Sequence, residues 1–169
     1  MGSMDRCADC GFDYSVTTTQ TARRMIRDSS EDIATMVAGA GDSVARRSDP
    51  DVWSPLEYGC HVRDVLLVQR ERTLLALVED TPSFVPMYRD RRVDDARYGA
   101  ELPAAVAAHL AMASSLLLWV FEGLTAEQLD RPCVYNYPEP TQRIVEWLLV
   151  HTAHEVVHHA ADVRRELGR

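Results

Sequence analysis

The chain has 169 residues, of which 46% are hydrophobic, and a formal net charge of -8 at pH 7. This length suits one domain with a substantial buried core. The negative charge argues against nucleic acid as a partner, because phosphate binding needs clustered Lys and Arg. We find no apolar run long enough to cross a bilayer and no signal-peptide pattern, which predicts a cytoplasmic protein without membrane contact.

The N-terminal residues 1–16 form a segment distinct from the helices that follow. Met1-Gly2-Ser3 is typical of the remnant of an expression tag, which makes Met4 the expected natural start. Cys7 and Cys10 form a CxxC pair, which is half of a zinc site, and no second CxxC follows. The other two cysteines have no motif spacing. The pair is either two free thiols or part of a structural zinc site.

Helical periodicity accounts for most of residues 17–169. The clearest start is Ser54-Pro55-Leu56-Glu57, which combines a Ser cap, Pro at the first helical position and Glu at the third, a capping box. A second capping box, Thr125-Ala126-Glu127-Gln128, opens a short turn. We predict four helices, over residues 21–37, 55–79, 103–122 and 141–167. Residues 82–100 and 131–140 are expected to be irregular connections, and no strand is predicted. The fold class is all-α, a single four-helix bundle.

Four of the six histidines lie close together near the C-terminus. Residues three and four apart share one helix face, so His151, His154 and His158 form a stripe beside a row of apolar positions. His154 and His158 can reach one ion, whereas His151 and His158 are roughly 10 Å apart along the axis. A metal site therefore needs one adjacent pair and a ligand from elsewhere, which His61 on the second helix can supply. Hydrogen-bonded core histidines are the alternative, and His109 is expected at the surface.

Read literally, His154-Glu155-Val156-Val157-His158 is the HExxH motif of zinc peptidases, with two ligands and a general-base Glu. These enzymes usually draw a third ligand from downstream, and only 11 residues follow His158. Their peptide substrates usually pair with an edge strand, which the predicted helices do not offer. The context therefore argues against a peptidase.

The chain resembles the DinB/YfiT-like metalloprotein superfamily, in which one His opens the second helix and an HxxxH pair lies on the last. Here these residues are His61, and His154 with His158. The resemblance covers nearly the whole domain. It is closest to an actinobacterial branch in residues 7–14, 53–58 and 158–163.

This resemblance implies an up-down-down-up bundle with a divalent metal held by His61, His154 and His158. Zinc is expected first, but three His also suit nickel, iron or manganese. Characterised relatives include thiol S-transferases and mycothiol-dependent maleylpyruvate isomerases, in which the metal is thought to lower the pKa of a small thiol. Zinc does deprotonate a coordinated thiol, and three protein ligands leave a position for it. The leading expectation is a metal-dependent enzyme that uses a thiol such as mycothiol for S-transfer or isomerisation of a small molecule.

Other residues near the histidine stripe are candidates for further roles. Glu155 and His159 are the candidate catalytic residues: Glu155 becomes a general base if it reaches bound water, in which case the chain is a metallohydrolase. His159, with Asp162, can orient a ligand or donate to substrate. Arg63 and Arg143 are candidates for binding an anionic group of the thiol cofactor or substrate. A non-catalytic metal- or ligand-binding bundle, with a homodimer through an exposed helix face, is the third alternative.

Overall fold

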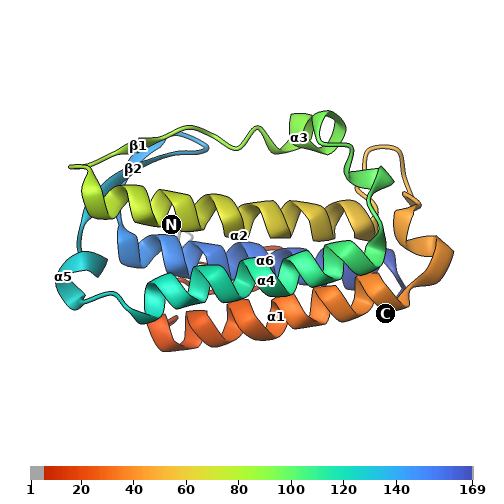
Figure 1. Cartoon of the computed structure of the whole chain (residues 1–169), viewed down its shortest axis with the longest axis horizontal. Helices are drawn as coiled ribbons and strands as arrows, with labels where there is room; N and C mark the ends of the chain where they lie inside the picture. Colours follow the sequence, from red (N-terminus) through yellow and green to blue (C-terminus); the bar gives the residue numbers. More distant parts are fainter. Residues whose placement is uncertain (1–5, 169) are drawn as a thin grey trace.

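The computed structural model describes residues 6–168, so the tag remnant expected at Met1–Ser3 and the start at Met4 lie outside the described residues. Four long helices make up the body of the molecule, and the shorter elements lie along one side of them and at their ends (Figure 1). The long helices are α1 (Thr19–Gly39), α2 (Pro55–Val78), α4 (Pro103–Glu122) and α6 (Val145–Glu166). The connections contain η1 (Gly41–Ala45), α3 (Arg89–Asp95), η2 (Tyr98–Ala100) and α5 (Ala126–Leu129).

The four long helices enclose one core, as predicted. Both α1 and α2 pack against α4 and α6, so that each helix has two main neighbours. α1 and α6 run in one direction, whereas α2 and α4 run in the other (Figure 1). The order is therefore up-down-down-up. Because α2 and α4 are consecutive and parallel, the chain between them must travel back along the whole bundle.

The start of α2 follows the predicted local chemistry. The Ser54 side chain accepts from the backbone N–H of Glu57 (3.3 Å), and the Glu57 carboxylate accepts from the backbone N–H of Ser54 (2.7 Å). One turn later, Gly59 allows three helices to approach closely. A Cβ placed there would lie 3.1 Å from Val37 Cγ2 on α1 and 3.3 Å from Val106 Cγ1 on α4.

The crossover between α2 and α4, residues 79–102, is anchored to α2 by a partly buried carboxylate. Asp64 accepts from Tyr98 Oη (2.7 Å), from Arg92 Nη1 (3.0 Å) and from Arg63 Nε (2.9 Å). Burial raises the pKa of Asp64, but these hydrogen bonds and the charge of Arg63 outweigh it and hold the pKa below its ordinary value. An element expected to be irregular is thus fixed in place over the bundle.

The prediction that the chain lacks strands is wrong. β2 (Pro132–Asn136) and β3 (Pro140–Ile144) form an antiparallel hairpin, and β1 (Ser83–Phe84) adds to β2 in parallel. Because residues 140–144 pair with β2, the last helix begins at Val145 rather than near Thr141. The hairpin is largely half-buried or exposed, so its sequence carries no apolar alternation that would mark it as strand.

The expectation that no apolar run is long enough to cross a bilayer is wrong for α4. Its 20 residues include no charged side chain before Glu122, so by length and composition it could cross a membrane. A core helix of a bundle meets the same test, and one face of α4 is built into the core. Its fully buried side chains are Val106, Leu110, Ala113, Leu117 and Phe121.

Candidate metal centre

The N-terminal segment is packed against α6 rather than separate from the bundle. Residues Cys7–Phe12 form a tight loop, here called the knuckle, closed by hydrogen bonds from Cys7 N to Phe12 O (2.8 Å) and from Gly11 N to Cys7 O (2.9 Å). Gly11 has φ +73°, a left-handed conformation that favours glycine. Phe12 is only 5% exposed, and its ring lies 5.4 Å from that of His154. The knuckle therefore belongs to the same core as the helices.

A first group of possible metal ligands lies between α2 and α6. His61, Glu155 and His159 each offer one ligand atom, and these atoms lie within 4.8 Å of one another. His61 is 2% exposed, and neither of its ring nitrogens has a hydrogen-bond partner in the described part of the chain. A buried polar atom without a partner is costly. A bound ion would satisfy one nitrogen, so His61 fits a metal ligand.

The charges in this group suit a divalent cation. Burial lowers the pKa of His61 to about 3, so its imidazole is neutral and able to bind a metal. Burial raises the pKa of Glu155, but the nearby His154 ring, whose Nδ1 lies 3.5 Å from Glu155 Oε1, and the other neighbouring histidines bring it down to about 2, so the carboxylate is ionised. His159 Nδ1 lies 2.8 Å from Asp162 Oδ2, and its Nε2 lies 3.9 Å from Glu155 Oε2. A carboxylate on one nitrogen commonly orients the other toward a metal.

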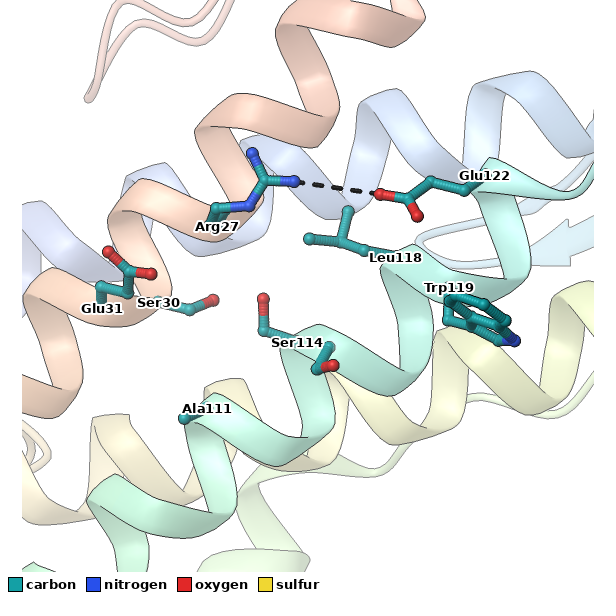
Figure 2. Close-up of a pocket in the computed structure, with 9 residues that line it drawn as sticks. Arg27, Ser30, Glu31, Ala111, Ser114, Leu118, Trp119 and Glu122 are labelled. Carbon is teal, nitrogen blue, oxygen red and sulfur yellow. Dashed lines mark ion pairs between the residues drawn. The ribbon is translucent and has the colours of Figure 1, made fainter.

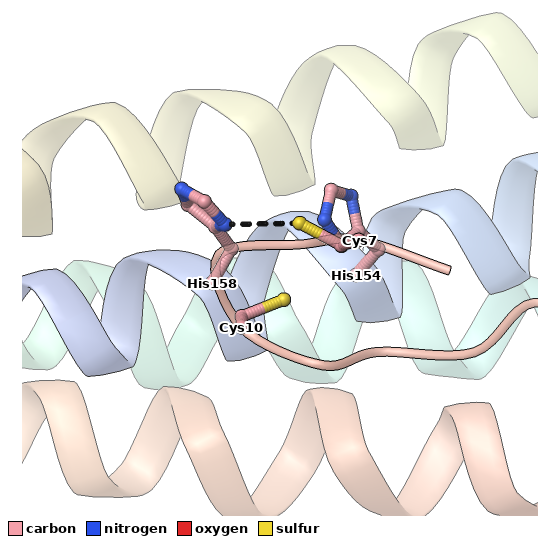
Figure 3. Close-up of side chains that lie close together, drawn as sticks. All are labelled: Cys7, Cys10, His154 and His158. Carbon is pink, nitrogen blue, oxygen red and sulfur yellow. Dashed lines mark hydrogen bonds between the residues drawn. The ribbon is translucent and has the colours of Figure 1, made fainter. Parts of the chain in front are cut away.

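A second group of ligand atoms lies on the adjacent side of α6 (Figure 3). Cys7 and Cys10 from the knuckle come together with His154 and His158, all within 4.8 Å. Burial raises the pKa of Cys7, but the backbone of Cys10 and the nearby His154 side chain lower it to about 6. The Cys7 sulfur therefore has strong thiolate character.

The structure thus divides the ligand set predicted from the sequence. His61 is grouped with Glu155 and His159, whereas His154 and His158 face the knuckle. The two pairs on α6 have the same spacing of four residues, and each lies about 100° round the helix from the other. Which pair faces α2 depends on the rotation of α6 about its own axis. The two candidate catalytic residues, Glu155 and His159, therefore lie with His61 in a group of possible metal ligands.

A cavity of about 430 Å³ opens beside this first group. It contains His61 and Glu155, and on its α2 side it contains Arg72, which the sequence analysis did not single out. Arg72 is buried, donates from Nη2 to Val85 O (2.5 Å) and lies 5.0 Å from the centre of the Tyr135 ring. Among residues 6–168 no carboxylate forms an ion pair with Arg72. A buried cation without an anionic partner suits an anionic group of a ligand.

A second hollow, of about 560 Å³, reaches the same group from the other side. His159 and Asp162 line it, together with Arg165 and the knuckle residue Cys10. Arg89 and Asp90 at the start of α3 line both hollows. The crossover therefore forms a wall shared by the two cavities.

The other sequence candidates lie away from this site. Arg63 is engaged by two carboxylates, donating to Asp64 (2.9 Å) and to Glu101 (2.6 Å). Arg143, on β3, lies over the Trp147 ring at 4.7 Å and lines a separate hollow. Neither arginine lines the cavity that contains His61. His109 is exposed, as predicted.

A further hollow of about 230 Å³ lies between α1 and α4 (Figure 2). Arg27 and Glu122 form an ion pair across it (3.9 Å), with Ser30 and Ser114 below. Within the described residues, no group of possible metal ligands adjoins this hollow. Each group of possible metal ligands in the described part of the chain includes residues of α6.

Comparisons with known proteins agree with this architecture. The chain is similar to YfiT from Bacillus subtilis, described as a probable metal-dependent hydrolase with an unusual four-helix bundle topology. The two chains share 16% sequence identity and a TM-score of 0.68, over 88% of this chain and 89% of YfiT. None of the curated proteins matches the sequence. The family model of the DinB superfamily matches residues 22–163, a span that includes all three residues of the first group, and the chain therefore belongs to the DinB superfamily.

Proposed function

We propose that this protein is a metal-dependent enzyme that binds its divalent ion through His61, Glu155 and His159 and acts on a small anionic molecule. The observation that carries the proposal is the buried His61 ring, whose nitrogens have no partner while an ionised carboxylate and an oriented imidazole lie beside it. Two imidazoles and one carboxylate suit zinc first, and also nickel, iron or manganese.

The bound ion would lower the pKa of a thiol or a water molecule and so supply a nucleophile at neutral pH. Asp162 holds His159 through Nδ1 and so fixes the direction of Nε2. Arg72 lies in the wall of the cavity, where it can bind the anionic group of the substrate. In this arrangement Glu155 is a ligand, so it is not free to act as a general base.

The nucleophile we favour is a low-molecular-weight thiol such as mycothiol, used in S-transfer or thiol-assisted isomerisation. The two hollows on either side of the ligands support this choice, because a thiol cofactor and a substrate need separate space. The hollow next to His159 is lined by charged side chains, which suits a polar, hydroxyl-rich thiol. These side chains are Asp9, Asp51, Arg89, Asp90, Asp162 and Arg165.

Hydrolysis is the second candidate, and the observation in its favour is the fold shared with YfiT, a probable metal-dependent hydrolase. In that reaction water takes the place of the thiol. The two candidates use the same ligands and differ in whether turnover needs a thiol.

The test begins with metal content by elemental analysis of the wild-type protein and of His61→Ala, His159→Ala and Glu155→Gln variants. Each variant should contain one equivalent of metal fewer than the wild-type protein, whereas His109→Ala, at an exposed position, should keep the wild-type metal content. Wild-type metal content in His61→Ala would refute the site. If Glu155→Gln keeps the ion but loses activity, Glu155 is a base rather than a ligand.

The reaction is then tested on a panel of small carboxylate-bearing electrophiles and esters, each with and without added thiol. Turnover that requires the thiol supports S-transfer or isomerisation, and turnover of esters without it supports hydrolysis. An Arg72→Met variant should raise KM for anionic substrates and leave KM for neutral analogues unchanged. No turnover by fully metal-loaded protein on any member of the panel would favour a non-catalytic binding protein.

A further inference from the structure

The knuckle and its two partner histidines form a ligand group that lies partly outside the region matched by the family model. That match begins at residue 22, whereas Cys7 and Cys10 precede it. Two thiols and two imidazoles are the ligand set of a structural zinc site, in which all four positions are filled by protein. The CxxC motif provides only two of the four ligands of such a site, and α6 provides the other two.

The four ligand atoms lie close enough together, all within 4.8 Å, to share one ion. Cys7 Sγ lies 3.8 Å from His158 Nδ1. Zn–S and Zn–N bonds of ordinary length in a tetrahedron separate these two atoms by about 3.6 Å. Both ring nitrogens of His154 are buried and have no hydrogen-bond partner within residues 6–168. Figure 3 shows the two sulfurs and the two rings directed toward one another.

Two other groups of possible ligands overlap with this one, and each includes a residue whose side chain is already hydrogen-bonded. In the first, which combines His151 with His154 and Glu155, His151 Nδ1 lies 2.9 Å from Tyr14 Oη. The second combines His158 with His159 and Asp162. Both carboxylate oxygens of Asp162 are already hydrogen-bonded, Oδ2 to His159 (2.8 Å) and Oδ1 to Arg165 (2.6 Å). The two groups that remain are separate, and each includes one histidine whose ring nitrogens have no hydrogen-bond partner: His61 in the first and His154 in the second.

We propose that Cys7, Cys10, His154 and His158 bind a second metal ion, a structural zinc that fixes the N-terminal segment to α6. Because protein ligands fill all four positions, this ion has no place for substrate. Its histidines alternate along α6 with Glu155 and His159 of the first group. Zinc here would therefore hold α6 in the rotation that directs Glu155 and His159 toward His61. The proposal stands on its own ligands and does not depend on the proposed enzymatic function.

The test uses zinc analysis and cobalt substitution of the full-length protein. Wild type should bind two equivalents. A Cys7→Ser/Cys10→Ser double variant should bind one, and His61→Ala should also bind one. With cobalt in place of zinc, the near-ultraviolet thiolate-to-cobalt charge-transfer absorption should be present in wild type and in His61→Ala. It should be absent from the double variant.

The matched control is Cys133→Ala, which removes a buried cysteine elsewhere and should keep both ions and the absorption. Circular dichroism, together with the ion retained at the first group, shows that the double variant has folded. Two results would overturn the proposal. One is a cobalt spectrum of wild type without thiolate absorption, and the other is a disulfide between Cys7 and Cys10 in protein purified under reducing conditions. Either result would leave the metal counts at His61 and His159 unaffected, so the failure of one site does not imply failure of the other.

Discussion

Replacing Asp64 by Asn tests whether one partly buried carboxylate holds the crossover over the site. Asp64 Oδ2 accepts from Tyr98 and Arg92, and Oδ1 accepts from Arg63. An Asn side chain keeps one acceptor oxygen and places an NH₂ group where the other oxygen was. If the oxygen stays with Tyr98, the NH₂ group faces Arg63, so that two hydrogen-bond donors oppose each other. The hydrogen bonds from Tyr98 and Arg92 remain, but they are weaker because the acceptor is no longer charged.

The magnitude follows from these contacts. Hydrogen bonds to charged groups contribute about 1.5–3 kcal/mol each. Asp64→Asn loses one such bond and weakens two, although Arg63 keeps its bond to Glu101. The Asp64 side chain is 13% exposed, so solvent screens these interactions little. We expect the free energy of unfolding to fall by about 2–3 kcal/mol.

Urea unfolding at pH 7 measures this change, and hydrogen exchange shows where it acts. Amides of residues 89–100 should lose protection first, because Arg92 and Tyr98 belong to α3 and η2. Asp95→Asn is the matched control: its ion pair with Arg91 is exposed, so the loss should stay below about 0.5 kcal/mol. A loss below about 1 kcal/mol for Asp64→Asn, or equal protection across the crossover, would refute this account.

Two further predictions concern packing and pH. Gly59→Ala gains about 1 kcal/mol of helix propensity, but its Cβ presses on the stiff side chains of Val37 and Val106, so we expect a net loss of about 1 kcal/mol, and a higher Tm would contradict it. The metal-free protein should lose stability as the pH falls below 6.5, because burial lowers the pKa of His61 to about 3 and that of His151 to about 4. Both groups take up protons first in the unfolded chain, so each lowers the free energy of unfolding by up to about 1.4 kcal/mol per pH unit in this range. A free energy of unfolding that stays constant from pH 7 to pH 5, measured in urea after chelation, would show that the pKa values of these two histidines are not lowered in the folded protein.

The helices could be predicted because their signals are local. The capping box at Ser54 and Glu57 lies within four residues, and it sets the start of α2 where it was expected. The hairpin could not be predicted in this way. Its strands are short and largely unburied, and β2 gains a second partner, β1, from about 50 residues earlier in the chain. Pairing over that distance leaves no periodic pattern in either segment.

The metal site shows a different limit. The sequence placed His61 and the last helix together, and it identified the apolar row of α6, which is fully buried at Val156 and Val163. At about 100° per residue, Glu155 and His159 lie at the edge of that row, whereas His154 and His158 lie on the face of α6 opposite to it. The knuckle covers this opposite face. A contact with a loop so distant in the chain leaves no periodic pattern in α6 that would reveal it.

The contact between the knuckle and α6 also has a consequence for the order of folding. Cys7 and His158 are 151 positions apart, so a ribosome has made nearly the whole described chain before they can meet. Closing so long a loop is slow and entropically costly. The CxxC pair is therefore exposed throughout synthesis while its partner histidines are still missing. An ion captured early would be held by two thiolates alone, and it would acquire its remaining ligands only when α6 docks as the last helix of the bundle.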